Sequence, residues 1–167
     1  MMMKVIIQMP CLNEEDSLPI SLGDLPRQLD GVDQVEWLII NDGSRDGTVE
    51  VAKELGVDYV ISHVKNLGLA QAFLSGMNAC VAFGADIIVN TDGDGQYAGH
   101  SIADLVAPIV RGEADIVVGD RKPGENTDFS ASKRTLQRVG SAVVKTLASI
   151  DVPDAVSGFR AYSREAA

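Results

Sequence analysis

Three oxygen-bearing side chains follow one another at two-residue intervals in the segment Asp92-Gly93-Asp94-Gly95-Gln96. The segment comes directly after the hydrophobic run Ala85–Thr91, at the point where a buried strand would end. Glycines between the polar residues let the backbone bend, so that the three side-chain oxygens can converge on one point. Mg²⁺ and Mn²⁺ prefer such ligands, together with water and substrate phosphates. The spacing therefore indicates a divalent-metal site, although the same residues are also typical of a Gly/Asp-rich turn after a strand.

The elements that would position this segment alternate between apolar runs and amphipathic stretches. Strands are predicted over Lys4–Met9, Val35–Asn41, Tyr59–Ser62, Asp86–Thr91, Asp115–Gly119 and Gly158–Tyr162. Helices are predicted over Glu15–Leu29, Asp46–Leu55, Leu69–Phe83, Ser101–Arg111 and Ser132–Ile150. Strands that alternate with helices and are apolar on both faces indicate an α/β fold, with a mostly parallel central sheet and helices on both of its faces.

Polar residues recur where the predicted strands end. They form the clusters Pro10–Glu15, Asn41–Ser44, Asp92–Gln96 and Asp120-Arg121. In open α/β sheets, ligands bind beyond the carboxyl ends of the strands, so we expect these clusters to meet at one edge and form the functional site. The polar, turn-rich insertion Lys122–Ala131 could serve as a mobile lid over it.

The composition is that of a single globular domain. The 167 residues are 46% hydrophobic and 23% charged, and no apolar run reaches the roughly 20 residues that a membrane helix needs. The N-terminal residues Met1–Lys4 lead straight into the first predicted strand, which is too short a leader for a signal peptide. Cys11 and Cys80 have no partners at a metal-like spacing and form no disulfide framework. We therefore expect a reduced, cytoplasmic protein.

Charge is unevenly distributed along the chain. The net charge of −10 argues against a general nucleic-acid binder, and we expect no nucleic-acid partner. Residues 1–120 hold 6 Lys/Arg against 19 Asp/Glu, whereas residues 121–167 hold 8 against 5. This distribution suits a substrate whose phosphates meet a metal on one side and cations on the other. Each cation by itself could equally belong to a solvated helix face.

Two common nucleotide-binding motifs are missing from the sequence. There is no Gly-x-Gly-x-x-Gly after the first strand and no Gly-x-x-x-x-Gly-Lys-Ser/Thr, which argues against a dinucleotide Rossmann site and a P-loop. A nucleotidyltransferase is disfavoured on similar grounds, because Cys11–Glu15 is acidic where a Gly-rich, basic phosphate loop would be expected. A proline followed by acidic residues suits contacts to a base and a ribose better than a phosphate cradle.

Six motifs follow one another along nearly the whole chain. They are Met9–Glu15, Ile40–Thr48, Asn66–Ala72, Asp92–Gln96, Val118–Arg121 and Asp154–Arg160. Together, and in this order, they resemble the family 2 glycosyltransferases of the GT-A fold. The resemblance is closest to the branch that includes dolichol-phosphate mannosyltransferase and other polyprenyl-phosphate sugar transferases. It implies the Rossmann-like fold of the nucleotide-diphospho-sugar transferases.

The resemblance implies roles for the residues on the side of a nucleotide-sugar donor. Pro10, Leu12 and Glu14 would line the nucleoside pocket. Asp42 would accept a hydrogen bond from the base or ribose, although a turn or helix cap is an equally suitable role for it. Lys65 and Gly68 would allow close backbone packing near the donor or would simply form a turn, and Gly93 would also contact the donor.

The resemblance also implies a metal site and an acceptor site. Asp92 and Asp94, completed by Gln96, would bind Mg²⁺ or Mn²⁺, and Arg121 would meet the phosphates of the nucleotide sugar. Arg134, together with Lys133, would attract the phosphate of the acceptor, and Arg160 would lie near the acceptor side.

The chain departs from the family pattern in several places. Asn41 stands where relatives usually carry an aspartate, so no role that needs two adjacent charges is expected there. Gln137 and Ser141 stand where relatives often carry serine and asparagine, on the acceptor side. Relatives also continue beyond Ala167 with further helix and strand. We therefore expect one catalytic domain, residues 1–167, that is truncated at its acceptor end.

The predicted activity is metal-dependent, inverting transfer of a sugar from a UDP- or GDP-sugar to an acceptor. A polyprenyl phosphate, dolichyl or undecaprenyl, is favoured because its oxygen is already anionic, and it would bring the protein to the cytoplasmic face of a membrane. A glycan hydroxyl, as in cell-wall or polysaccharide synthesis, would require a carboxylate base. Asp154 and Asp120 are the candidates for that base, although Asp154 could simply cap a loop. A nucleotide-sugar-binding domain without turnover is the alternative of a different class.

Overall fold

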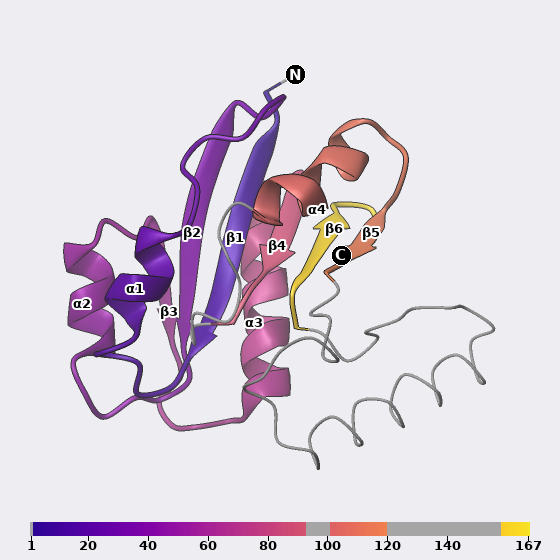
Figure 1. Ribbon diagram of the computed structural model, residues 1–167. Coiled ribbons are helices and arrows are strands. Elements are labelled where there is room, and N and C mark those ends of the chain that lie inside the picture. The colour runs from indigo at the N-terminus through magenta and orange to yellow at the C-terminus, as the bar shows by residue number, and fades with distance from the viewer. Residues whose placement is uncertain (1, 93–100, 120–157) are drawn as a thin grey trace, which may run out of the picture.

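The computed structural model describes residues 2–92, 101–119 and 158–167, which form a sheet with helices on both of its faces (Figure 1). The strands are β1 Lys4–Cys11, β2 Gln34–Asn41, β3 Tyr59–Ser62, β4 Ile87–Asn90, β5 Ile116–Val118 and β6 Arg160–Ser163. The helices are α1 Leu18–Gly23, α2 Thr48–Glu54, α3 Leu69–Ala82 and α4 Ser101–Val110. The predicted α/β fold is confirmed.

The strands of the described sheet lie in the order β3-β2-β1-β4-β6-β5. β1 pairs in parallel with β2 and β4, and β2 pairs in parallel with β3, whereas β6 runs antiparallel to both β4 and β5. The sheet is therefore mostly parallel, as predicted, and the four parallel strands end at the same edge. The strand order reverses between β1 and β4, and ligands bind beside such a reversal in open α/β sheets.

Successive side chains of β1 point to opposite faces of the sheet, and the core is therefore divided into two layers. Val5, Ile7 and Met9 face one side of the sheet, where they pack with residues of α1, α2 and α4. Ile6 faces the other side and packs with Ala72 of α3. Figure 1 shows α3 behind the sheet and α4 in front of it. Because both faces are covered, the strands are apolar almost throughout, which explains why the hydrophobic runs were so clear in the sequence.

β1 continues two residues beyond its predicted end at Met9, through Pro10 to Cys11. A proline is unusual in a central strand because it has no N–H to donate to a neighbouring strand. Here β4 pairs with β1 only as far as Gln8, whose carbonyl accepts a hydrogen bond from Thr91 N at 3.1 Å. Pro10 therefore lies beyond the end of β4 and lines a cavity where a neighbouring strand would otherwise lie.

α1 is shorter at both ends than the predicted helix over Glu15–Leu29. Pro19 lies in the first turn of α1, where the N–H groups have no partner within the helix and a proline is tolerated. The helix ends at Gly23, before Pro26 would have interrupted its hydrogen bonds. The carbonyl of Pro26 instead accepts a hydrogen bond from the indole of Trp37 at 3.1 Å, which fastens the segment after α1 to the core.

Two predicted features, the helix over Ser132–Ile150 and the lid Lys122–Ala131, lie outside the described residues. The longest of the described helices is α3, with 14 residues. Within residues 2–92, 101–119 and 158–167, no helix has both the length and the apolar character needed to cross a bilayer.

Candidate functional site

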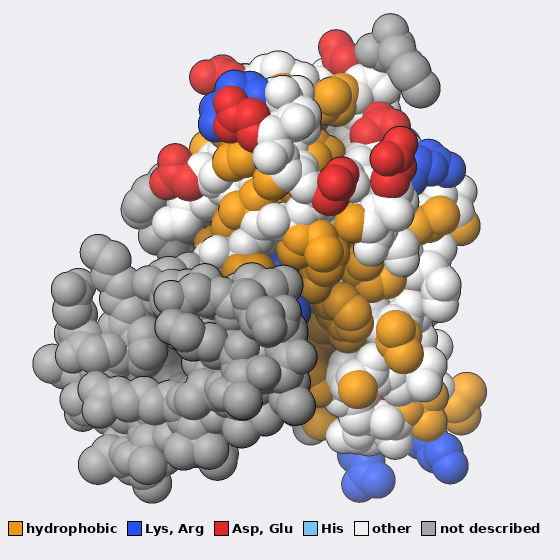
Figure 2. All heavy atoms as spheres, turned by 90° about the vertical axis from the view of Figure 1, so that its right-hand side faces the viewer, with side chains coloured by type: hydrophobic (Ala, Val, Ile, Leu, Met, Phe, Trp, Pro, Cys, Tyr) orange, Lys and Arg blue, Asp and Glu red, His pale blue; other side chains and the backbone are white. Residues whose placement is uncertain are grey.

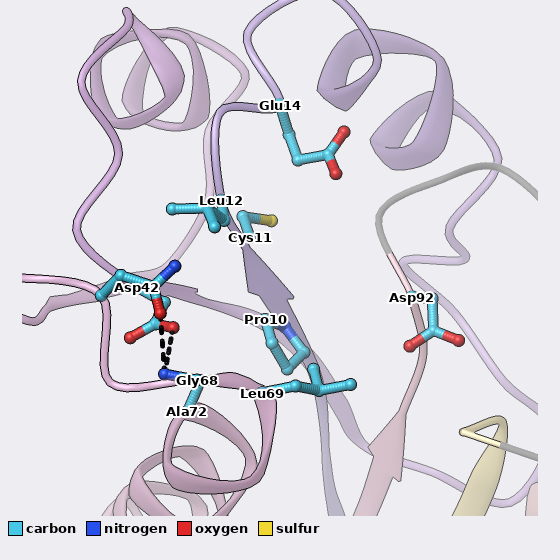
Figure 3. Close-up of a pocket in the computed structure, with 10 residues that line it drawn as sticks. Pro10, Cys11, Leu12, Glu14, Asp42, Gly68, Leu69, Ala72 and Asp92 are labelled. Carbon is cyan, nitrogen blue, oxygen red and sulfur yellow. Dashed lines mark hydrogen bonds between the residues drawn. The ribbon is translucent and has the colours of Figure 1, made fainter. Parts of the chain in front are cut away.

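Two adjoining cavities lie at the edge of the sheet where β1, β2 and β4 end. The first cavity has a volume of about 390 Å³ and is lined by Pro10, Cys11, Leu12, Glu14, Asp42, Asn66, Gly68, Leu69, Ala72 and Asp92 (Figure 3). The second cavity has a volume of about 670 Å³ and is lined by Pro10, Leu69, Ala70, Phe73, Leu74, Asn90, Asp92, Gly158, Arg160 and Tyr162. Pro10, Leu69 and Asp92 line both cavities, so the two meet beside the Asp92 carboxylate.

Six of the site residues predicted from the sequence come together in the first cavity. They are Pro10, Leu12, Glu14, Asp42, Gly68 and Asp92. These residues come from the end of β1, the end of β2, the loop before α3 and the end of β4. The parallel pairing of the strands brings these segments to one edge of the sheet. Their contacts with a ligand stay predictions.

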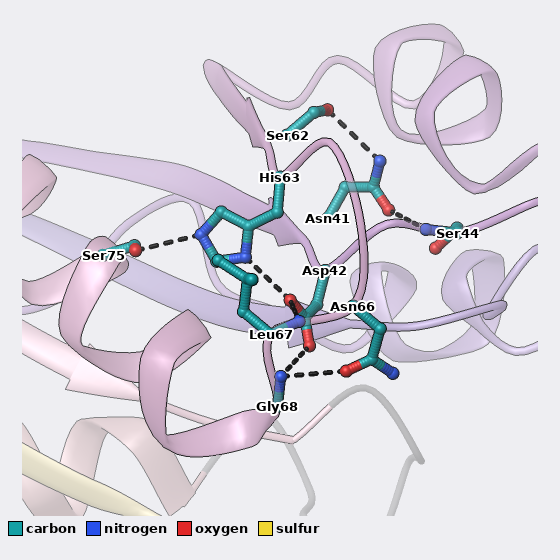
Figure 4. Close-up of polar contacts among 9 residues, drawn as sticks. All are labelled: Asn41, Asp42, Ser44, Ser62, His63, Asn66, Leu67, Gly68 and Ser75. Atoms are coloured by element: carbon teal, nitrogen blue, oxygen red, sulfur yellow. Dashed lines mark hydrogen bonds and ion pairs between the residues drawn. The ribbon is translucent and has the colours of Figure 1, made fainter.

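Asp42 is a deeply buried anion in the wall of the first cavity, with 4% of its surface exposed. Its carboxylate accepts hydrogen bonds from the backbone N–H groups of Leu67 and Gly68, each at 2.9 Å, and lies 2.7 Å from His63 Nδ1 (Figure 4). Burial acts to raise the pKa of Asp42, but the hydrogen bonds from His63, Leu67 and Gly68 outweigh it and lower the pKa below its ordinary value. Asp42 is therefore ionised at neutral pH.

Asn41 takes the turn-forming role that the sequence left open for Asp42. Its side-chain oxygen accepts a hydrogen bond from Ser44 N at 2.8 Å, and its amide nitrogen donates to Ser62 Oγ at 3.2 Å. The first of these bonds joins residues three positions apart and closes the turn that follows β2. Asp42 is thereby left to hold the loop that precedes α3, through the contacts with Leu67 and Gly68.

The loop after β1 is fastened to the loop after β2. Asn13 N donates to Ser44 Oγ, and Arg45 N donates to Asn13 Oδ1, both at 2.9 Å. Glu14 N donates to Thr48 Oγ1, also at 2.9 Å. Asn13 adopts a φ of 55°, a left-handed conformation that asparagine tolerates better than most residues. These hydrogen bonds hold the wall that the first loop contributes to the first cavity.

Asp92 follows directly after β4 and packs against Gly158. A Cβ added at Gly158 would lie 2.8 Å from Asp92 Oδ2, so the backbone approaches the carboxylate as closely as only a glycine permits. Asn90 Nδ2 donates to the Gly158 carbonyl at 2.7 Å, and Gln8 Nε2 donates to Asn90 Oδ1 at 3.0 Å. Both amides are buried, and such groups are nearly always hydrogen-bonded. This amide pair fixes Asp92 relative to the entry into β6.

Two further predicted residues lie away from the first cavity. Arg160 begins β6 and lines the second cavity. Lys65 is exposed and lines a third cavity of about 410 Å³, which includes residues of the loop after β2 and shares Leu12 and Asn66 with the first cavity. A Cβ added at Gly43 would lie 2.5 Å from the carbonyl carbon of Lys65. The backbone of Lys65 therefore packs closely against Gly43.

The remaining predicted site residues lie outside the described part of the chain. They are Gly93, Asp94, Gln96, Asp120, Arg121, Lys133, Arg134 and Asp154. Within the described ranges, no three His, Cys, Asp or Glu side chains are grouped so that they could hold a metal ion. Asp92 is the predicted metal ligand whose position the structure gives.

Several residues of the site were not recognised individually in the sequence. Asn66 and Leu69 line the first cavity, and His63 contacts Asp42. The signal for His63 is its position directly after Tyr59–Ser62, because that strand ends at the same edge of the sheet as the other parallel strands. Leu69 carried no such signal, since an apolar residue at the start of a helix is usually part of the core.

Neither cysteine is available as a nucleophile. Cys11 lines the first cavity but is only 2% exposed, and Cys80 is fully buried. Burial raises the pKa of both thiols to about 12, and the negative charges of Glu14 and Asp46 also raise the pKa of Cys11.

We expect iodoacetamide at about pH 8 to leave both thiols unmodified in the folded protein, because almost no thiolate is present and access is blocked. The same reagent should alkylate both in concentrated guanidinium chloride. Mass spectrometry of the intact protein would count the modified thiols. Rapid alkylation of Cys11 in the folded protein would contradict its burial.

Residues 6–167 match the family described as Glycosyl transferase family 2. An undecaprenyl-phosphate mannosyltransferase of Micrococcus luteus is 28% identical over 166 residues, covering 96% of this chain and 66% of the relative. A polyprenol monophosphomannose synthase of Mycolicibacterium smegmatis is 28% identical over 169 residues, covering 97% of this chain and 62% of the relative. A UDP-N-acetylglucosamine–dolichyl-phosphate N-acetylglucosaminyltransferase of Methanococcus voltae is 29% identical over 180 residues, covering 97% of this chain and 70% of the relative. The chain thus spans about two thirds of the length of these curated relatives.

Among solved structures, glucosyl-3-phosphoglycerate synthase from Mycobacterium tuberculosis, in complex with Mn²⁺, UDP-glucose and phosphoglyceric acid, is similar with a TM-score of 0.74. The sequence identity is 22%, and the similarity covers 98% of this chain and 57% of that chain. This likeness confirms the predicted GT-A fold. The sequence match runs from β1 through β6 of this fold, and the chain therefore belongs to glycosyl transferase family 2.

Proposed function

We propose that the chain transfers a sugar from a nucleotide-diphosphate sugar to a polyprenyl phosphate. The observation that carries this proposal is the junction of the two cavities at Asp92, because a donor in one cavity and an acceptor in the other would meet there. The names of the three curated relatives, which include undecaprenyl-phosphate, polyprenol and dolichyl-phosphate, support the choice of acceptor.

The first cavity suits the nucleoside of the donor. The ionised carboxylate of Asp42 is an acceptor for a base N–H or a ribose hydroxyl, and both uracil and guanine present such an N–H. Pro10 and Leu12 offer apolar surface to the faces of a base, and Glu14 offers a second acceptor for hydroxyl groups. An apolar cavity with a few convergent polar groups is the usual form of a small-molecule site.

A divalent cation fits at Asp92. The carboxylate lines both cavities and lies where the donor diphosphate would pass between them, and a carboxylate is a ligand that Mg²⁺ and Mn²⁺ prefer. Asp92, with Asp94 and Gln96, would hold Mg²⁺ or Mn²⁺, as the complex of the structural neighbour with Mn²⁺ and UDP-glucose supports. The bound cation would neutralise charge that develops on the leaving diphosphate. Arg121 would add a fixed positive charge there.

The second cavity suits a lipid phosphate. Leu69 and Leu74 contribute to its apolar wall and are 67% and 51% exposed, and Arg160 lines the same cavity. Hydrophobic side chains gather in a band on the face shown in Figure 2, whereas the acidic side chains in that view gather toward its upper end. An isoprenoid chain would lie on the apolar wall with its phosphate near Arg160, Lys133 and Arg134. Binding of this kind would bring the protein to the cytoplasmic face of a membrane.

The chain's residues would bind and orient the two substrates rather than supply a base. The attacking oxygen of a phosphate monoester is already anionic, so its attack on the anomeric carbon needs no proton removal. The bond from that carbon to the diphosphate oxygen breaks as the new bond forms on the opposite face, which inverts the configuration. Asp42 would hold the nucleoside during this step, and Asp92 would hold the divalent cation to which the diphosphate binds. Asp154 would be required as a base only for a hydroxyl acceptor.

The test is a transfer assay with the full chain, Mg²⁺ and a short polyprenyl phosphate, using radiolabelled UDP-glucose, UDP-N-acetylglucosamine and GDP-mannose in turn. We expect one donor to yield a labelled product that extracts into organic solvent. No product should form with the corresponding unphosphorylated polyprenol or after addition of EDTA. Transfer of label to a glycan instead would replace the lipid acceptor, and nucleotide binding without transfer to either acceptor would indicate a binding domain.

A further inference from the structure

A histidine and a serine that line neither cavity extend the polar contacts of Asp42 away from the site. His63 places Nδ1 2.7 Å from Asp42 Oδ1 and Nε2 3.0 Å from Ser75 Oγ on α3. Figure 4 shows the imidazole ring between the two side chains. The side chains of His63 and Asp42 are 11% and 6% exposed. Any influence of His63 on a ligand in the first cavity must therefore pass through Asp42.

Among the described residues, the donors to Asp42 leave one acceptor position on its carboxylate. Oδ1 accepts hydrogen bonds from Leu67 N and from His63, and Oδ2 accepts one from Gly68 N. A carboxylate offers about four lone-pair positions, two on each oxygen, so the remaining position is on Oδ2. Because Asp42 lines the first cavity, this is the position that a ligand N–H or hydroxyl would use.

The chemistry of Asp42 determines which nitrogen of His63 carries a proton. An ionised carboxylate can only accept, so Nδ1 must be the donor. In the neutral ring, Nε2 then accepts from the Ser75 hydroxyl, and in the charged ring it donates to the Ser75 oxygen. A hydroxyl can serve both arrangements, so Ser75 holds the plane of the ring in either state.

His63 holds Asp42 from the end of β3, whereas the two backbone donors, Leu67 and Gly68, belong to the loop before α3. Leu67 and Gly68 are consecutive residues of one loop and move together with it. His63 follows β3, and its ring is fastened to α3 by Ser75. The terminal torsion of an aspartate is broad, so a carboxylate held only by the loop could turn and redirect its remaining acceptor position.

We propose that His63, held by Ser75, is a positioning residue that keeps the remaining acceptor position of Asp42 directed at the nucleoside of the donor. The inference rests on the proposed function, because it takes a nucleoside diphosphate as the ligand of the first cavity. His63 touches neither the ligand nor the reacting atoms. Its loss should therefore raise the KM for the donor more than it lowers kcat.

Two substitutions separate the roles of the ring nitrogens, because an asparagine amide can occupy the place of Nδ1 and a glutamine amide that of Nε2. We expect His63→Asn to bind UDP or GDP, with Mg²⁺, within about threefold of wild type, since a donor to Asp42 is kept. His63→Gln and His63→Ala should bind about tenfold more weakly or worse, as calorimetry would measure. Ser75→Ala should weaken binding about threefold, because only the anchor of the ring is lost.

The matched control is Ser62→Ala, which removes a neighbouring hydrogen bond with Asn41 but no contact of Asp42. It should leave the affinity for the nucleotide unchanged. A loss equal to that of His63→Ala would mean that any disturbance at the end of β3 weakens binding, and would overturn a specific role for His63.

Nuclear magnetic resonance of the full chain without nucleotide reports on the carboxylate directly. The amide protons of Leu67 and Gly68 donate to Asp42, so their shifts should change in His63→Ala and His63→Gln and stay close to wild type in His63→Asn. If the amide shifts of Leu67 and Gly68 did not change in His63→Ala, the positioning role of His63 would be overturned. If the shifts changed but the affinity for the nucleotide did not, the proposed effect of that positioning on donor binding would be overturned. If the wild type binds neither UDP nor GDP, the proposed function fails, while the amide shifts still decide the positioning.

Discussion

Replacing Asp92 with asparagine is expected to lower the rate of sugar transfer by at least about a hundredfold. The substitution keeps the shape of the side chain and removes a negative charge where the two cavities meet. A neutral amide is a poorer ligand for Mg²⁺ than a carboxylate, so charge on the leaving diphosphate would be less well neutralised. Because asparagine fits beside Gly158 as aspartate does, the free energy of unfolding should change by less than about 1 kcal/mol.

The comparison for this variant is Asp104→Asn, which removes the same charge from an exposed position on α4, away from both cavities. Transfer rates at a series of Mg²⁺ concentrations, and urea unfolding curves, would be measured for both variants. Asp104→Asn should transfer at the rate of the wild type. If Asp92→Asn were fully active with an unaltered requirement for metal, the role proposed for Asp92 would be wrong.

Gly76→Ala should lower the free energy of unfolding by about 2 kcal/mol or more. A Cβ at this position would overlap Gln8 Oε1 and would lie 2.7 Å from Ile40 Cδ1. Gln8 cannot withdraw without disturbing its hydrogen bond to Asn90, since it is fully buried between β1 and α3. The helix propensity that alanine gains over glycine, about 1 kcal/mol, offsets only part of this cost.

The matched control is Gly23→Ala at the end of α1, where an added Cβ meets nothing within 4 Å. Urea unfolding should show this variant to be as stable as the wild type or slightly more stable. In the double variant Gln8→Ala/Gly76→Ala, the loss should be less than the sum of the two single losses, because the two residues share one clash. A Gly76→Ala protein as stable as the wild type would show that the Gln8 side chain can move away at little cost.

The sheet and its functional edge were predictable because both depend on local patterns. Burial on two faces makes the parallel strands largely apolar, as Ile87–Val89 illustrates, and the polar residues that follow mark the end of the strand. The end of α1 was also readable, since Pro26 lies inside the predicted helix and a proline there breaks its hydrogen bonds. The predicted helix over Glu15–Leu29 runs past this boundary, because its apolar residues continue beyond Gly23.

The contacts inside the site were not predictable, because they join residues that are distant in the sequence. Asp42 and His63 are 21 positions apart and meet only because β2 pairs with β3. Gln8 and Asn90 are 82 positions apart and meet only because β1 pairs with β4. Gln8 alone reads as a polar interruption of a hydrophobic strand, and its partner becomes evident only when the order of the strands is known.

The pairing of β5 with β6 has a consequence for how such proteins diversify. Gly119 N donates to the Phe159 carbonyl at 2.8 Å, and Val118 is paired with Arg160, so the chain leaves the sheet and returns to it at one place. The intervening segment, which carries the proposed acceptor residues Lys133 and Arg134, is joined to the sheet at two adjacent points. Doubling the length of a chain segment whose two ends are held together costs only about 0.6 kcal/mol in closure entropy. Evolution could therefore exchange or lengthen the segment, and with it the proposed acceptor residues, while the strands that hold the proposed donor residues are inherited unchanged.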